Sequence, residues 1–228
     1  MTVDGPAARP RPERLRRLPD VVAVRPRLLL VGINPGLRSS REGHHFAGNG
    51  NPFWRLLHAS GLTPSLLAYA EDQRLAEHGI ALTNLCPRPT RTAAELSRAE
   101  LVRGRATLAR KIARWQPQVV AFVGVSLYRA YFGVSGGPGP GPKAEVIAGA
   151  RVFVVPNPSG LNASFPGFAH KLPWFRALRA FVDAAGPGAS LLRAGARRSR
   201  RRTSARGARS RGRQPPKMAA ASIVSTLA

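Results

Sequence analysis

Residues 27–36, which read RLLLVGINPG, decide the fold of this chain. The run Arg27–Val31 is almost wholly apolar and does not alternate with polar residues, which is typical of a strand buried on both faces. Pro35 and Gly36 cannot continue such a strand and predict a turn. The polar Asn34 therefore lies where a buried strand ends, and in open α/β sheets ligands bind at that edge.

A second stretch repeats this pattern near the other end of the domain. Val152–Val155 is apolar, and residues 156–162 (PNPSGLN) follow it as a Pro- and Gly-containing loop. An amide such as that of Asn34 both accepts and donates hydrogen bonds, so it could orient a water molecule. Alternatively it only caps the turn, where Asn is common. Leu161 lies among small and polar residues, and its side chain is either tucked into the core or held out as a wedge.

Strands and helices alternate along the chain, which predicts an α/β fold: a three-layer α/β/α sandwich with a mostly parallel central sheet of four to five strands. The expected strands cover residues 27–33, 79–84 and 118–125, with a pair at 144–147 and 151–156 joined at Gly149. The expected helices cover residues 52–60, 66–78, 92–115, 126–132 and 168–185. Residues 37–51 are predicted to form a long surface loop, and such loops inside compact domains are often functional.

Composition divides the chain into three parts. Residues 1–26 are rich in Pro and Arg and are expected to form an arm, and residues 27–185 form the predicted folded domain. Residues 186–228 are predicted to be a disordered basic tail, because Arg193–Lys217 holds eleven basic residues, no acidic one and no aromatic one. The tail is either a solvated extension without function or an electrostatic tether that holds DNA non-specifically.

The charge of the chain favours a polyanionic partner. The 228 residues include 36 Lys and Arg against 11 Asp and Glu, a net charge of +25. Such a field attracts nucleic acid first and an anionic membrane surface second, although a coding bias towards Arg would also raise it. The single cysteine, Cys86, excludes internal disulfides and a four-cysteine iron–sulfur cluster.

The sequence carries no membrane, secretion or metal signal. It contains no run of about 18 apolar residues and no secretory signal, so we expect a soluble intracellular protein. His44, His45 and His58 lack carboxylates or cysteine at ligand spacing, so we expect neither a metal nor a cofactor.

Four motifs together resemble the mismatch-specific uracil-DNA and thymine-DNA glycosylases, in particular their bacterial G/U mismatch-specific branch. They are residues 32–36 (GINPG), Phe46 with 51–54 (NPFW), 83–85 (TNL) with 88–90 (RPT), and 157–161 (NPSGL). The resemblance spans Arg27 to Asp183. It implies the uracil-DNA glycosylase fold, double-stranded DNA with a mismatched or damaged base as the partner, a monomer, and a location in the bacterial cytoplasm, associated with the nucleoid through DNA.

The resemblance also implies a role for each site residue. Asn34 would be the catalytic residue that holds the attacking water. The base pocket would consist of Ile33, Ser39 near the pyrimidine 5-position, Phe46 stacked on the pyrimidine, and Asn157 as a donor to a pyrimidine oxygen. The DNA wedge and the contacts to the opposite guanine would come from Ser159, Gly160, Leu161 and Asn162. Taken alone, Phe46 could equally be a hydrophobic plug for its loop.

Two positions depart from the branch that the chain resembles. Asn84 stands where that branch has a lysine, and Asn162-Ala163 stands where it has a small polar residue followed by arginine. We therefore expect the loop to grip the guanine or the nearby backbone differently.

The leading hypothesis is a monofunctional DNA glycosylase, a hydrolase that flips out uracil from G·U-type mismatches and leaves an abasic site in base-excision repair. Thymine or other damaged bases are further substrates to consider. One alternative is a non-catalytic nucleic-acid-binding module with the same fold and a basic tail. Another is an α/β enzyme acting on free nucleotides, against which the Leu161 wedge argues, since a free nucleotide leaves no gap to fill.

Overall fold

A computed structural model describes residues 15–137, 139–160 and 162–186. Within them lies one five-stranded sheet of order β2-β1-β3-β5-β4. The strands are β1 Leu28–Gly32, β2 Ile80–Asn84, β3 Val119–Val123, β4 Gly141–Ile147 and β5 Ala150–Val155. β1, β2, β3 and β5 run parallel, and β4 pairs antiparallel with β5. The helices are α1 Leu37–Glu42, α2 Phe53–Ala59, α3 Arg98–Trp115, α4 Val125–Phe132 and α5 Leu172–Asp183, with 3-10 helices η1 Tyr69–His78 and η2 Ala93–Glu95.

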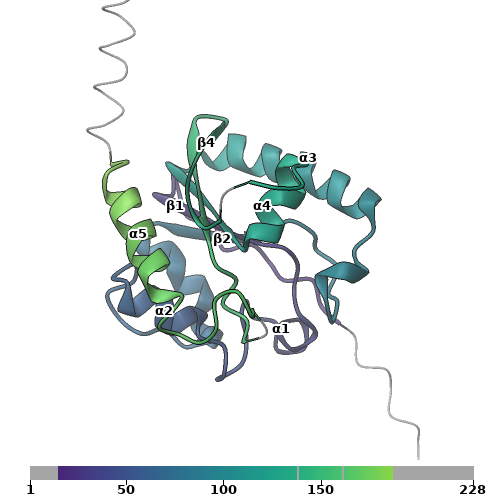
Figure 1. Cartoon of the computed structure of the whole chain (residues 1–228). Coiled ribbons are helices and arrows are strands. Elements are labelled where there is room, and N and C mark those ends of the chain that lie inside the picture. The colour runs from purple at the N-terminus through teal and green to yellow at the C-terminus, as the bar shows by residue number, and fades with distance from the viewer. Residues whose placement is uncertain (1–14, 138, 161, 187–228) are drawn as a thin grey trace, which may run out of the picture. The chain divides into compact units, whose positions relative to one another are not determined.

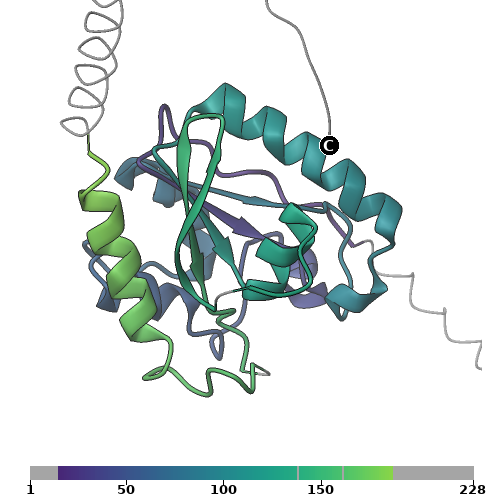
Figure 2. The ribbon, with the colours of Figure 1, turned by 45° about the horizontal axis from the view of Figure 1, so that its top comes forward.

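Helices cover both faces of this sheet, because the central strands are apolar on both sides. One buried cluster joins Leu28 and Leu30 of β1 to residues of α2 and α5. The other joins Leu29 and Val31 of β1 to residues of α3 and α4. Figures 1 and 2 show α3 and α4 on one side of the sheet and α2 and α5 on the other. The predicted three-layer α/β/α class with a mostly parallel sheet is therefore confirmed.

The strand order places a topological switch point between β1 and β3. The chain leaves β1 to form β2 on one side of it, and later returns to form β3 on the other side. At such a point the loops after the two strands diverge and leave a crevice in which ligands bind. The loops that begin at Ile33 and at Gly124 flank this crevice.

Three predicted helical or loop segments differ from the structure. The loop predicted over residues 37–51 begins with helix α1, whose buried residues are Ser39 and Ser40, so no apolar periodicity marked it. The helix predicted over 92–115 is two helices, because Ser97 forms a capping box with Glu100 and restarts the chain as α3. The helix predicted over 66–78 is the shorter 3-10 helix η1.

The arm predicted over residues 1–26 does not extend to residue 26. Val21 is fully buried and exchanges backbone hydrogen bonds of 2.9 Å with Leu82 of β2. Asp20 forms an ion pair with Lys111 at 2.7 Å. Residues 15–26 thus pack on the domain, which the single buried residues Val21 and Ala23 were too few to signal. The rest of the predicted arm, residues 1–14, and the predicted tail beyond residue 186 lie outside the described residues.

Close packing of α3 against the loop after β2 makes Gly104 hard to replace. A Cβ at this position would lie 2.6 Å from the carbonyl oxygen of Leu85 and 3.3 Å from Sγ of Cys86. We expect Gly104→Ala to lower the free energy of unfolding by about 1–3 kcal/mol, the usual cost of overpacking a core. Urea unfolding would measure it. Helix propensity alone predicts the opposite sign, a gain of about 1 kcal/mol, so a stabilised variant would contradict the prediction.

None of the helices in the described part of the chain is long and apolar enough to cross a bilayer.

Candidate active site

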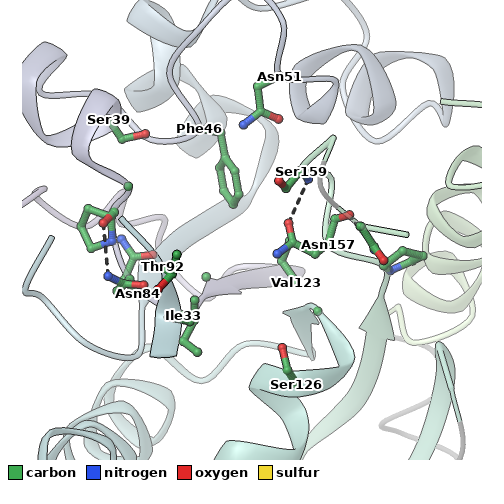
Figure 3. Close-up of a pocket in the computed structure, with 18 of the residues that line it drawn as sticks. Ile33, Ser39, Phe46, Asn51, Asn84, Thr92, Val123, Ser126, Asn157 and Ser159 are labelled. Atoms are coloured by element: carbon green, nitrogen blue, oxygen red, sulfur yellow. Dashed lines mark hydrogen bonds between the residues drawn. The ribbon is translucent and has the colours of Figure 1, made fainter. Parts of the chain in front are cut away.

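A pocket of about 850 Å³ lies at the carboxyl edge of the parallel strands (Figure 3). Its walls come from the loops after β1, β2, β3 and β5 and from residues 37–51. Figure 3 shows Phe46 and Asn157 facing the same space from different segments of the chain, with Ile33 below Phe46. The described residues of the predicted site that line the pocket are Ile33, Asn34, Ser39, Phe46, Asn157, Ser159 and Asn162.

The amide of Asn34 is held in one orientation. Its Nδ2 donates to Thr90 Oγ1 at 2.6 Å, to the carbonyl oxygen of Arg88 at 3.0 Å and to that of Pro35 at 3.2 Å. Thr90 Oγ1 donates its own hydrogen to the Thr92 carbonyl at 2.7 Å, so it can only accept from Asn34. With three acceptors around the nitrogen, Oδ1 is the free end, and no described residue donates to it. Oδ1 is therefore available to accept from a water or a ligand.

The loop after β2 that supplies these acceptors is itself fixed. The Thr90 N–H donates to the Pro35 carbonyl at 3.1 Å, and the Arg88 guanidinium forms two hydrogen bonds to Glu100 at 2.6 and 3.0 Å. The bond from Arg88, with those from Ser97, lowers the pKa of Glu100 to about 2. Glu100 is thus ionised at neutral pH and ties the loop to the start of α3.

Phe46 presents one face of its ring to the pocket because the other is covered. Its ring stacks on Phe53 of α2, with centroids 3.7 Å apart and planes 16° apart. The backbone at Phe46 has φ of 49°, in the left-handed region that a bulky residue rarely adopts. Such a conformation persists only where the surroundings hold it.

Asp72 anchors the segment that holds Phe46. It is 1% exposed, and its carboxylate accepts from the His45 N–H at 2.9 Å and lies 3.2 Å from Nδ1 of His44. The ring of His45 is buried, which lowers its pKa, and its Nε2 lies 2.9 Å from the Pro19 carbonyl oxygen. The two histidines that precede Phe46 are thus structural partners of this loop.

Ser39 and Ile33 lie on different sides of the pocket. Ser39 is 8% exposed, and its Oγ accepts from the Ala47 N–H at 3.1 Å, which fixes the backbone directly after Phe46. Ile33 packs against the cluster beneath α3 and α4, whereas Phe46 packs against the cluster beneath α2 and α5. The pocket therefore draws one apolar wall from each side of the sheet.

The loop after β5 folds on itself through two amide side chains. Asn157 Oδ1 accepts from the Ser159 N–H at 2.9 Å, and Asn162 Nδ2 donates to the Asn157 carbonyl at 3.0 Å. Because Oδ1 of Asn157 faces its own loop, Nδ2 is the end that can donate to a ligand. Gly160 is exposed. Leu161, the predicted wedge, lies outside the described residues.

Asn84 belongs to the pocket, although the sequence predicted no site role for it. It ends β2 in register with Gly32, the residue before Ile33. A Cβ on Gly32 would lie 2.5 Å from Asn84 Oδ1 and 3.8 Å from the tip of the Phe46 ring, so only glycine leaves the space between them. A polar residue ending a buried strand was the signal that identified Asn34, and it applies to Asn84 as well. Other lining residues that sequence reasoning missed are Arg38, Asn51, Arg91, Thr92, Ser126, Arg129, Ser164 and Phe165.

The described residues contain no group of three or more His, Cys, Asp or Glu side chains that could hold a metal ion. The pocket offers instead amides, hydroxyls, an aromatic face and arginines. Such a set can bind a planar polar ring and an anionic backbone.

The chain is similar to known proteins in sequence and in structure. The family model described as the uracil DNA glycosylase superfamily matches residues 19–179. A G/U mismatch-specific uracil DNA glycosylase of Schizosaccharomyces pombe is 39% identical over 114 residues, which cover 49% of this chain and 35% of that protein. A solution structure from Methanosarcina acetivorans, assigned provisionally as a uracil DNA glycosylase, matches with a TM-score of 0.47 and 21% identity over 72% of this chain and 98% of that one.

Proposed function

Since the chain belongs to the uracil DNA glycosylase superfamily, we propose that it is a monofunctional DNA glycosylase that excises uracil from G·U mismatches in double-stranded DNA. The product would be an abasic site for base-excision repair. The S. pombe relative and the shared motifs support the mismatch preference. It is a proposal because this chain matches only 35% of that relative's length.

The observation that carries the proposal is the fixed amide of Asn34. Three acceptors hold its nitrogen and leave Oδ1 as a hydrogen-bond acceptor at the pocket. A water that donates a hydrogen bond to Oδ1 would have a lone pair directed at a nucleoside whose base fills the pocket. A non-catalytic binding module would have no need for an amide fixed in this orientation at the end of a buried strand.

The base itself would be bound between the two walls of the pocket. A uracil flipped out of the duplex costs a few kcal/mol of unstacking, and the open face of Phe46 would recover part of it by stacking. Asn157 Nδ2 would donate to a pyrimidine carbonyl. That hydrogen bond strengthens as the N1–C1′ bond breaks and negative charge develops on the uracil.

The chemical step is hydrolysis. The C1′–N1 bond breaks, uracil departs as an anion, and the water oxygen bonds to C1′ and releases its proton to solvent. An amide cannot take up that proton as a strong base, so the rate must come from the position of the water and from stabilisation of the anion. We therefore expect slow turnover.

We do not expect the protein to cut the DNA strand through a Schiff base. None of the described residues that line the pocket is a lysine, and Lys171, which lies nearby, is 1% exposed and bonded to the carbonyl oxygens of Pro158 and Ser159. It is not free to attack C1′. The abasic site is thus the expected final product.

Residues 159–162 would face the DNA opposite the flipped base. Ser159 and Asn162 line the mouth of the pocket, and Gly160 between them is exposed. An apolar side chain at Leu161 would fill the gap that the flipped nucleotide leaves, as apolar wedges between base steps do in minor-groove binding proteins. The backbone around Gly160 and Leu161 would then contact the orphaned guanine.

The test is excision from end-labelled oligonucleotides that carry one uracil opposite guanine, opposite adenine or in a single strand. Alkali afterwards cuts the abasic sites. We expect the most excision at G·U, and we expect no cut DNA strand before alkali treatment. A folded protein that binds these duplexes but excises neither uracil nor other damaged pyrimidines would refute the proposal and support the binding-module alternative.

A further inference from the structure

Among the described residues Lys171 is a deeply buried charged residue, as exposed as Asp72, and the proposed mechanism does not use it. It is 1% exposed and directly precedes α5. Its Nζ donates to the carbonyl oxygen of Pro158 at 3.2 Å and to that of Ser159 at 3.1 Å. Within the described residues no carboxylate lies within ion-pair distance of it, whereas Lys111 has Asp20 at 2.7 Å.

Burying an ammonium without a counter-ion is costly, and lysine is almost never fully buried unless it is paired. Desolvation lowers the pKa of Lys171 accordingly. Hydrogen bonds from a charged donor are roughly twice as strong as neutral ones, and here they offset part of that cost. An apolar side chain of the same length would pack in the same space at no such cost. The charge therefore needs a reason beyond packing.

The two carbonyl oxygens belong to the loop after β5, in which the side chains of Asn157 and Asn162 bond to backbone groups of the loop itself. Lys171 links this loop to a rigid element. Its backbone is bonded to Phe168 at 3.1 Å, and α5 is anchored in the core through Phe175 and Leu178, both fully buried. The position of this loop is thus fixed by α5 through Lys171.

We propose that Lys171 is a positioning residue that clamps the Pro158–Ser159 backbone. This clamp holds the residues after Ser159 in the position from which they contact the opposite strand of the duplex when a base is flipped. This inference rests on the proposed glycosylase function. The clamp acts on the step that only a duplex requires. A single strand has no opposite base to contact and no stack to open, so its uracil can enter the pocket without the loop.

The test uses Lys171→Met, which keeps the length of the side chain and removes its donors, and Lys171→Gln, which keeps a neutral donor. Lys111→Met is the matched control, since it removes a lysine bonded to Asp20 and Thr83 instead. We expect Lys171→Met to lower the ratio of the single-turnover rate on a G·U duplex to that on the same single strand by about 10–100-fold, the scale for a misplaced positioning group. Lys171→Gln should lie between it and the wild type, and Lys111→Met should leave the ratio unchanged.

Equal losses on both substrates, or no loss, would overturn the clamp. A second readout is independent of activity: hydrogen exchange of a peptide over residues 156–165 should become faster in Lys171→Met, while peptides from α5 keep the wild-type rate. Unchanged exchange over 156–165 would also overturn it. Failure of the wild type to excise uracil from G·U would instead count against the proposed function, and the exchange measurement would still decide the clamp.

Discussion

Replacing Asn34 with alanine is expected to lower the single-turnover rate of uracil excision from a G·U duplex by about 10²–10³-fold, the usual cost of removing one fixed polar group at a reaction centre. The reason is geometric. Asn34 lines the pocket, and the bonds from its Nδ2 to Thr90, Arg88 and Pro35 leave Oδ1 as the open acceptor. Without it the attacking water has no fixed partner. The measurement is the observed rate with enzyme in excess over labelled duplex.

Asn49→Ala is the matched control for this variant, because Asn49 is an exposed asparagine that does not line the pocket. It should keep the wild-type rate. Thr90→Val removes the shortest of the three bonds to the Asn34 nitrogen while keeping the shape of the side chain. It should lie between Asn34→Ala and the wild type. Wild-type rates in Asn34→Ala, with folding and DNA binding intact, would remove Asn34 from the reaction.

The second large effect is expected at Phe46. Stacking of a base on an aromatic side chain contributes about 1–3 kcal/mol, so Phe46→Ala should lower kcat/KM for G·U duplexes by about 5–150-fold. Phe46→Leu separates the two interpretations of this residue. A leucine would still plug the loop and pack on Phe53, but it would offer no flat face to the base. If stacking is the role, both variants are impaired.

Thermal unfolding of both Phe46 variants provides the control, because Phe46 also stacks on Phe53 at 3.7 Å and Phe46→Ala will cost stability. Rates should therefore be measured well below the melting temperature of the weaker variant. Near-wild-type activity in Phe46→Leu would show that the residue acts only as a plug.

The strand ends were the most predictable part of this chain. The apolar residues 28–31 directly predicted a buried strand, and the polar Asn34 followed by Pro35 marked its end. Parallel strands bring their carboxyl ends to one edge, which is where the strand endings at Asn34 and Asn157 lie. They do line one pocket. The motifs at these endings also indicated the superfamily that the family model matches.

Several supports of the site were not predictable, because they depend on which segments the fold brings together. Asp72 holds the backbone before Phe46 from 27 positions away, and nothing local marks it. Helix α1 escaped detection because it buries two serines, which carry no hydrophobic period.

The sequence by itself determined the α/β class and the edge of the sheet at which the site lies, since both depend on local patterns of apolar, polar and turn-forming residues, and the resemblance of its motifs to a known family indicated the superfamily. Only the tertiary structure decided how the amide of Asn34 is oriented, that Asn84 faces Gly32, and that Lys171 is buried against the Pro158–Ser159 carbonyls. The physical reason is the same in each case. A hydrogen bond depends on the distance and direction between two groups, and for groups far apart in the chain these are set by packing.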